Sequence, residues 1–311
     1  MRKEEILMAY LAGAMDGDGS FSICKSMQGD RSPLYYPVIQ LSNACEAIID
    51  LFKETFNGKK HVRKPYIAKD GGSRRTNYHW MIQRQPSCLP MLERIIPYLV
   101  LKKERAEFLL KFIKDNPYKR GSVRIDQKTL EYRESSYLKM RGMNDERIVT
   151  KNLTRHHAKK DNDSETFCSY MAGLIDTDGS FTITKRKNHT NMVSPAYSVL
   201  IQLSSVDIKS INHILENFQG GKVHLRKGNN CRTGFCYRYV LTNRENVVRF
   251  CKKIKPFLIL KKRQAEIMID FCENKKEIKY CKGGIPESEL KFREKCRKEI
   301  INLNMGSINF R

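Results

Sequence analysis

Short stretches of alternating or helically spaced apolar residues begin at the first residues of the chain. Over residues 4–16 the side chains of Ile6, Tyr10 and Leu11 share one helical face, which predicts a helix. The stretch "SFSIC" then alternates, with Phe21 and Ile23 pointing to one side. "YYPVIQLSN" alternates in the same way, with Ile39 and Leu41 inward. The pattern therefore predicts a helix followed by two strands that are each buried on one face.

The same kind of pattern predicts the remaining elements of the first half. A helix is expected near 44–56, then the strands "HVRK" and "NYHWMIQ", then helices at about 87–96, 101–114 and 128–142. The order is α-β-β-α-β-β followed by helices. Runs of strands interrupted by helices in this way predict an α+β domain with a four-stranded antiparallel sheet.

This set of segments occurs twice in the same order. "YLAGAMDGDGSF" (Tyr10–Phe21) is answered by "YMAGLIDTDGSF" (Tyr170–Phe181), and "IPYLVLKKERAE" is answered by "KPFLILKKRQAE". Two copies are too few for a solenoid, so a whole domain has been duplicated. The sequence predicts an N-terminal domain at 1–144, a polar and basic linker at 145–161, and a C-terminal domain at 162–311.

Composition narrows the class of partner. The 311 residues include 58 Lys and Arg against 34 Asp and Glu, which gives a formal net charge of +24. A surplus of this size favours a polyanion partner, nucleic acid first. No apolar run approaches the length that spans a membrane, and "MRKEEILMAYLAG" resembles no secretion signal. The ten cysteines are scattered, which predicts free thiols in a reducing compartment rather than a disulfide framework or a zinc site.

The outward-facing positions of the predicted strands carry side chains that can read base edges. Arg, Gln, Ser, Thr and His all hydrogen-bond to bases in the major groove, and a sheet can lie in that groove. An ordinary solvated sheet face is the alternative, but the net charge and the recurrence in both repeats favour contact with double-stranded DNA. The predicted DNA-binding residues are Ser22, Cys24, Ser26, Gln40, His61, Arg63, His79, Thr182, Thr184, Arg186, Gln202, His224, Arg226 and Arg238.

The twelve-residue motif places small residues inside a helix and carboxylates at its end. Gly costs about 1 kcal/mol relative to Ala in a helix interior, so close approach by another helix is the expected reason for it. The residues expected at such a helix interface are Ala12, Gly13, Ala172 and Gly173. If the two motif helices pack together, Asp18 and Asp178 lie close to each other. A hard divalent cation such as Mg²⁺ would relieve their repulsion and bridge them to phosphate.

Other interpretations of the acidic motif fit less well. An EF-hand is rejected, because Phe21 stands where its invariant glycine belongs and Met27 where its last glutamate belongs. A glycosidase with paired carboxylates would not explain the basic charge. Asp16 and Asp176 are expected to shape the turn that follows each helix by bonding its backbone.

At this point "LAGAMDGDG" (Leu11–Gly19) and "MAGLIDTDG" (Met171–Gly179) resemble the motif of the LAGLIDADG homing endonucleases, in their monomeric, single-chain branch. The resemblance covers nearly the whole chain. It implies two pseudo-symmetric αββαββα domains joined at paired motif helices, with a DNA-binding sheet in each. It also implies cleavage of both strands of a long asymmetric target across the minor groove, leaving 3′ overhangs, and a role in intron mobility.

The resemblance also assigns roles to single residues. Asp18 and Asp178 are expected to bind Mg²⁺, assisted by the carbonyl of Gly17 or Thr177. Ca²⁺ is expected to support DNA binding without cleavage.

Two further pairs of positions concern the water that attacks the phosphate. Lys102 and Lys261 match lysines that polarise the water network or stabilise charge in the family. Many relatives carry Gln at a position after the second strand, where this chain has Asn43 and Ser205. Water activation in the two active sites is therefore expected to be unequal.

The resemblance leaves alternatives of function. Some family members are RNA maturases that assist intron splicing, so intron RNA is a possible partner. A DNA-binding regulator with an inactive nuclease fold would be expected to lose Asp18 or Asp178, and this chain retains both. An organellar, mitochondrial location is expected only because such introns are common there.

Overall fold

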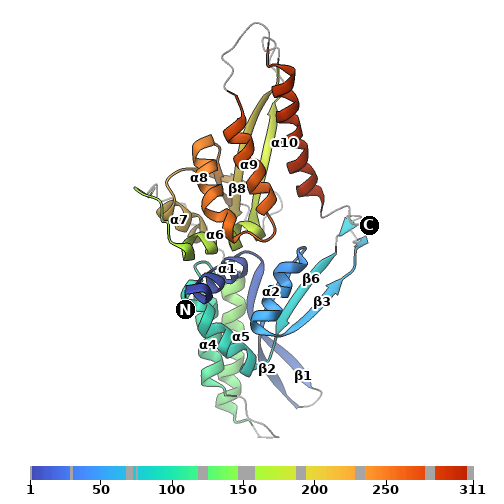
Figure 1. Ribbon diagram of the computed structural model, residues 1–311. Coiled ribbons are helices and arrows are strands. Elements are labelled where there is room, and N and C mark those ends of the chain that lie inside the picture. The colour runs from blue at the N-terminus through green and yellow to red at the C-terminus, as the bar shows by residue number, and fades with distance from the viewer. Residues whose placement is uncertain are drawn as a thin grey trace. The chain divides into compact units, whose positions relative to one another are not determined.

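The structure is a computed structural model that describes residues 2–28, 31–67, 73–74, 76–117, 125–145, 158–186, 194–227, 235–276 and 284–306. The chain forms two compact units, Met1–Ile148 and Val149–Arg311 (Figure 1). Each unit is described below by itself.

The first unit contains both helices and strands in the expected order. Its helices are α1 (Arg2–Asp18), α2 (Glu46–Phe56), α3 (Gln85–Ile95), the 3₁₀ turn η1 (Ile96–Tyr98), α4 (Lys103–Asp115) and α5 (Gln127–Asp145). Its strands are β1 (Gly19–Gln28), β2 (Arg31–Asn43), β3 (Lys59–Arg63), β4 (Tyr66–Ile67), β5 (Ser73–Arg74) and β6 (Asn77–Ile82). The sequence did not predict the short hairpin β4–β5, whose two-residue strands are too short to show a period.

The second unit repeats this plan. Its helices are α6 (Glu165–Asp178), α7 (Ile208–Asn217), α8 (Arg244–Ile254), the 3₁₀ turn η2 (Lys255–Phe257), α9 (Lys262–Asn274) and α10 (Glu287–Gly306). Its strands are β7 (Gly179–Arg186), β8 (Ala196–Ser205), β9 (Lys222–Lys227) and β10 (Phe235–Leu241). No described helix is long and apolar enough to cross a membrane. The cysteines among the described residues are all free thiols.

Each unit is built on one antiparallel sheet of four strands. The strand orders are β1-β2-β6-β3 and β7-β8-β10-β9, so the two sheets have the same topology. The predicted inward residues form the core: Phe21, Ile39, Leu41 and Trp80 are all fully buried. The α+β class and the four-stranded antiparallel sheets are therefore confirmed.

The motif helices end directly at the first strand of each sheet. Asp18 is the last residue of α1, and Gly19 opens β1. A Cβ atom on Gly19 would lie 2.7 Å from the carbonyl oxygen of Met15, and one on Gly179 would lie 2.8 Å from that of Ile175. The glycine after the acid is therefore required, because the chain turns back against the last turn of its own helix.

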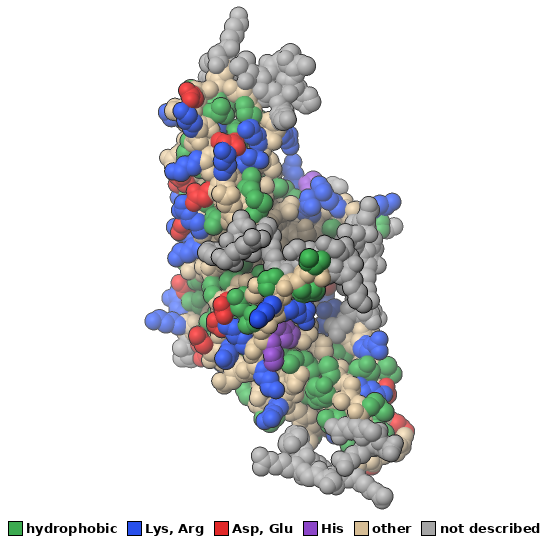
Figure 2. Space-filling view, turned by 90° about the vertical axis from the view of Figure 1, so that its right-hand side faces the viewer, with side chains coloured by type: hydrophobic (Ala, Val, Ile, Leu, Met, Phe, Trp, Pro, Cys, Tyr) green, Lys and Arg blue, Asp and Glu red, His purple; other side chains and the backbone are tan. Residues whose placement is uncertain are grey.

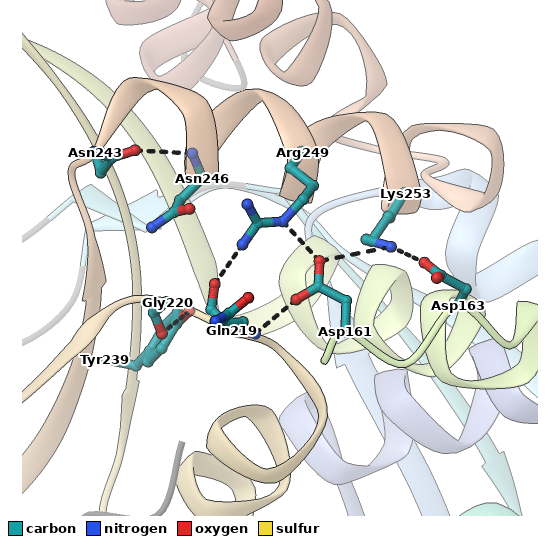
Figure 3. A network of polar contacts seen from close by, with 9 residues as sticks. All are labelled: Asp161, Asp163, Gln219, Gly220, Tyr239, Asn243, Asn246, Arg249 and Lys253. Carbon is teal, nitrogen blue, oxygen red and sulfur yellow. Dashed lines mark hydrogen bonds and ion pairs between the residues drawn. The ribbon is translucent and has the colours of Figure 1, made fainter. Parts of the chain in front are cut away.

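The second unit begins with a segment that folds onto its α7–α8 side. Ala158 donates its backbone N–H to Leu215, and the carboxylate of Asp161 accepts from Gln219 N and Arg249 Nε, both at 2.7 Å (Figure 3). Lys253 pairs with Asp163 beside it. The last residues of the predicted linker at 145–161 thus belong to the packed body of the second unit. Its first residue, Asp145, is the last residue of α5 in the first unit.

Candidate functional site

The predicted DNA-binding side chains lie together on the face of each sheet that points away from its core. The register places Ser22, Cys24 and Ser26 on the opposite face of β1 from the buried Phe21 and Ile23. The corresponding positions of the second unit follow the same alternation, and none of the predicted residues is buried. Lys and Arg side chains are spread over the surface seen in Figure 2, interleaved with Asp and Glu. Each sheet therefore presents a polar surface that is suited to base edges.

The outer face of the first sheet carries a cross-strand histidine pair. His61 on β3 lies directly opposite His79 on β6, with ring centroids 6.5 Å apart. Nδ1 of His79 lies 2.7 Å from Oγ of Ser42 on the neighbouring strand. Burial and the nearby positive charges of His61 and Arg63 lower the pKa of His79. At neutral pH the His79 ring is neutral, and the contact of its Nδ1 with Ser42 holds it in place. Its other ring nitrogen, Nε2, faces away from this contact and can bond a ligand.

We expect this pKa shift to make the stability of the first unit depend on pH. Because the pKa of His79 is lower in the folded protein, the unfolded chain takes up the proton first as the pH falls through 6.5. The contribution of His79 to the free energy of unfolding is therefore constant at higher pH and declines below that value. Urea unfolding at about pH 7.5 and about pH 5.5 should show that the free energy of unfolding falls more between these two values for the wild type than for His79→Gln. An equal loss in both proteins would contradict the assignment.

The two acids of each motif have opposite surroundings. Asp18 and Asp178 are exposed at the carboxyl ends of α1 and α6, whereas Asp16 and Asp176 are each only 1% exposed. The acids predicted to bind metal are thus the accessible ones.

Asp16 ties the end of α1 to a distant segment of the chain. Its carboxylate accepts the backbone N–H groups of Val100, Leu101 and Lys102 at 2.8 to 2.9 Å. These residues form the turn before α4. The sequence had predicted bonds to the backbone of the turn after α1, so the partner was wrong: the N–H groups that precede α4 lack helical acceptors and take the carboxylate instead.

Asp176 makes the same contacts in the second unit. It accepts N–H groups from Ile259, Leu260 and Lys261 at 2.8, 3.2 and 2.8 Å. The arrangement is therefore a duplicated feature of the fold.

Lys102 makes the return contact. Its Nζ donates to the carbonyl oxygens of Met15, Gly17 and Gly19 at 2.7 to 2.8 Å. An ammonium at the carboxyl end of a helix satisfies carbonyls that lack helical partners and opposes the negative end of the helix dipole. Asp16 and Lys102 together hold the end of α1 against the start of α4, immediately below Asp18.

Lys261 makes the matching contacts in the second unit, with one difference. Its Nζ donates to Ile175 O, Asp176 O and Gly179 O at 2.7 to 2.8 Å. Gly17 O, a predicted metal ligand, thus accepts a bond from a lysine, whereas the lysine of the second unit bonds Asp176 O instead of Thr177 O. The hydroxyl of Thr177 donates to Gly173 O and Leu174 O, both at 3.0 Å.

The environments of the two exposed acids differ at the last residue of the second strand, Asn43 in β2 and Ser205 in β8. The Asn43 side chain is 7% exposed, and its Nδ2 donates to Asp18 at 2.6 Å, while its Oδ1 accepts from Cys45 N. Ser205 instead accepts a bond from Asp207 N at 3.2 Å. Asn43 therefore fixes one oxygen of Asp18 through a contact that the shorter Ser205 side chain does not reproduce.

The residues at the ends of the motif helices fit a hard divalent cation. Asp18 and Asp178 offer carboxylate oxygens, and the carboxyl end of a helix favours positive charge. No three His, Cys, Asp or Glu side chains of the described residues gather into a metal cluster. Mg²⁺ suits this arrangement, because it commonly takes one or two carboxylates with water and phosphate as the other ligands. The pairing of α1 with α6 through Ala12, Gly13, Ala172 and Gly173 concerns the placement of one unit against the other and stays a prediction.

Sequence reasoning did not find the contacts of Asp16 and Asp176 or the carbonyl partners of the lysines. The sequence contained a signal for these contacts: the segments "PYLVLKK" and "PFLILKK", which contain the lysines, recur together with the motif acids in both repeats.

Comparisons with known proteins agree with this architecture. Residues 171–275 match the family model described as LAGLIDADG endonuclease. No curated protein sequence matches the chain significantly.

Similar solved structures span almost the whole chain. The LAGLIDADG homing endonuclease I-LtrWI, bound to target DNA, matches with a TM-score of 0.67 at 15% identity over 95% of this chain and 98% of that one. The LAGLIDADG meganuclease I-AabMI, bound to uncleaved DNA, matches with a TM-score of 0.63 at 16% identity over 94% and 98%. I-SmaMI, bound to an uncleaved DNA target in the presence of calcium ions, matches with a TM-score of 0.62 at 15% identity over 96% and 98%.

These likenesses show the fold of both units, and the family model matches the motif-bearing part of the second. With a complete motif helix, sheet and anchoring lysine in each half, the chain has the two-domain fold of these endonucleases, and residues 171–275 match the LAGLIDADG endonuclease family model.

Proposed function

We propose that this protein is a homing endonuclease that hydrolyses both strands of a specific double-stranded DNA target with a divalent cation, Mg²⁺. The observation that carries the proposal is the exposed acid at the end of each motif helix, beside a sheet face of base-reading side chains. The three similar structures described above are of proteins bound to DNA, and one of these proteins, I-SmaMI, was also solved with cleaved DNA.

The residues divide the work between recognition and hydrolysis. The outer faces of the sheets bind the base edges, and the basic surface binds phosphates. Asp18 and Asp178 would hold the cation, which supplies compensation for the charge on the phosphate and lowers the pKa of a bound water. Lys102 and Lys261 act as positioning residues, because their ammonium groups fix the carbonyls beneath each acid. Asn43 orients Asp18 and thereby makes the two sites unequal.

Several finer properties follow from the resemblance and are part of the proposal. They are action as a monomer, cleavage across the minor groove with 3′ overhangs, and promotion of intron mobility. Retention of both Asp18 and Asp178 supports a nuclease over an inactive regulator. The maturase role and the mitochondrial location stay predictions.

The experiment that tests the proposed function is selection of cleavable sites from a randomised duplex library with Mg²⁺. We expect one long, asymmetric consensus that is cut on both strands, and binding without cleavage when Ca²⁺ replaces Mg²⁺. Matched selection with an RNA library is the control. Cleavage without sequence preference, or no cleavage at all, would contradict the proposal.

A further inference from the structure

A lysine, a tyrosine and a glutamate form the same contact in both units, although the sequence motifs did not draw attention to them. In the first unit Lys25 on β1 lies directly opposite Tyr35 on β2, with its Nζ 5.6 Å from the centre of the tyrosine ring. Glu134 of α5 accepts a hydrogen bond from Lys25 at 2.6 Å and another from the hydroxyl of Tyr35.

The second unit repeats each of these contacts. Lys185 lies opposite Tyr197, with its Nζ 5.7 Å from the ring centre. Glu294 of α10 accepts from Tyr197 at 2.6 Å and from Lys185 at 3.1 Å. The two sets are called the Lys–Tyr–Glu triads below: Lys25, Tyr35 and Glu134; Lys185, Tyr197 and Glu294. Retention of three residue types in one geometry across a duplication indicates a role in both halves.

The triads lie where the sheet becomes a two-stranded ribbon. Among the described residues, β6 pairs with β2 only over Ile39–Asn43, so the part of the β1–β2 hairpin beyond them has no third strand. Likewise β10 pairs with β8 only over Ile201–Ser205. A two-stranded hairpin is at best marginally stable alone, so its outer part needs support from another element.

The C-terminal helices supply this support. Figure 1 shows α10 lying alongside the hairpin of the second unit, where it packs chiefly against β7, as α5 packs chiefly against β1. The tyrosines are buried, at 4% exposure for Tyr35 and 2% for Tyr197, while the glutamates reach them from the helices. Tyr35 also lies against Tyr137 of α5, with ring centroids 6.1 Å apart. The hydrogen bond from Tyr197 lowers the pKa of Glu294, so this carboxylate is charged at neutral pH.

The residues on the other side of the same ribbon are predicted DNA contacts. Cys24 and Ser26 flank Lys25 in the sequence and point to the outer face. Thr184 and Arg186 flank Lys185 in the same way. A strand fixed at Lys25 therefore also fixes where its two neighbours point, because successive side chains alternate between faces.

We propose that the Lys–Tyr–Glu triads are positioning elements for DNA recognition: each clamps the outer part of its hairpin to a C-terminal helix and so sets specificity for the outer base pairs of one half of the target. This inference rests on the proposed function. It assigns a separate half of the target to each triad. If the triads only stabilised the fold, removing one of them would not change specificity in one half of the target alone.

The test compares Tyr35→Phe, Tyr197→Phe and the wild type on a panel of targets that each carry one base substitution. Phenylalanine keeps the ring in place and removes only the hydroxyl that reaches the glutamate. We expect Tyr35→Phe to lose discrimination by about fivefold at the outer base pairs of one half-site, as fits the loss of one hydrogen bond. Tyr197→Phe should show the same loss in the other half. Discrimination at the central base pairs should stay at the wild-type level.

Tyr132→Phe is the matched control. Tyr132 lies on α5, as Glu134 does, but its hydroxyl donates to Asp115 at 2.7 Å and not to the hairpin. This variant also loses a tyrosine–carboxylate hydrogen bond, and it should keep the wild-type specificity profile. Circular dichroism confirms that each variant is folded before it is scored.

A second pair of variants tests the glutamate. Glu134→Gln keeps an acceptor oxygen for Tyr35, whereas Glu134→Leu removes it, so the Leu variant should lose more discrimination than the Gln variant in the same half-site. Unchanged profiles in both tyrosine variants, or losses spread evenly over the whole target, would overturn the inference alone. A wild-type protein without a preferred site would overturn the proposed function, and this inference with it.

Discussion

Asp18→Asn should abolish double-strand cleavage while DNA binding in Ca²⁺ stays measurable. The side chain keeps its size and an oxygen that can accept from Asn43, which donates to Asp18 at 2.6 Å. It loses the negative charge that a divalent cation requires, and the loss of such a ligand should lower the cleavage rate by at least about a hundredfold. The measurement is cleavage of the selected target on a gel, with both strands labelled.

Two further variants make this prediction specific. Asp178→Asn should show the same loss, because Asp178 occupies the same exposed position in α6. Glu54→Gln, which neutralises an exposed acid on α2, should cleave as the wild type does. Full double-strand cleavage by Asp18→Asn would refute the role of this residue in metal binding.

Asp16→Ala should strongly destabilise the first unit. The carboxylate is 1% exposed and accepts three backbone N–H groups, from Val100, Leu101 and Lys102. Its removal leaves these donors without an acceptor and leaves a small cavity, which should cost about 3 to 5 kcal/mol in the free energy of unfolding. The midpoint of thermal unfolding should fall by about 10 °C.

Calorimetry of two related variants completes the comparison. Asp16→Asn should be less destabilised than Asp16→Ala, because the amide oxygen can still accept some of the N–H groups. Asp115→Asn is the control, since Asp115 also accepts from two partners, Lys111 and Tyr132, but on the exposed surface, where little stability is at stake. If Asp16→Ala unfolds at the wild-type temperature, the three hydrogen bonds are not a major source of stability.

The contacts of Asp16 and Lys102 also explain why the motif contains two acids with different roles. The buried acid holds the end of the helix to the start of α4, and the lysine returns three hydrogen bonds to the same end. The exposed acid is thereby fixed at the helix terminus and stays accessible to solvent. A site of this kind is preorganised, because the groups that hold it are satisfied before DNA is bound.

The sequence by itself determined the duplication, the order of the main elements and the face on which each strand residue lies. Those features are local: the alternation around Phe21 and Ile23, or around Tyr237 and Tyr239, encodes the buried face directly. The motif likewise identified which residues are chemically special.

Only the tertiary structure decided what those residues contact. Asp16 reaches Val100, and Glu134 reaches Tyr35, across long separations along the chain, and no local period records which distant backbone groups are left without partners. The bond from Asn43 to Asp18 was missed for the same reason. The short hairpin β4–β5 was missed because its two-residue strands are too short to show a period. Periodicity depends on neighbours in the sequence, whereas hydrogen-bond satisfaction depends on neighbours in space.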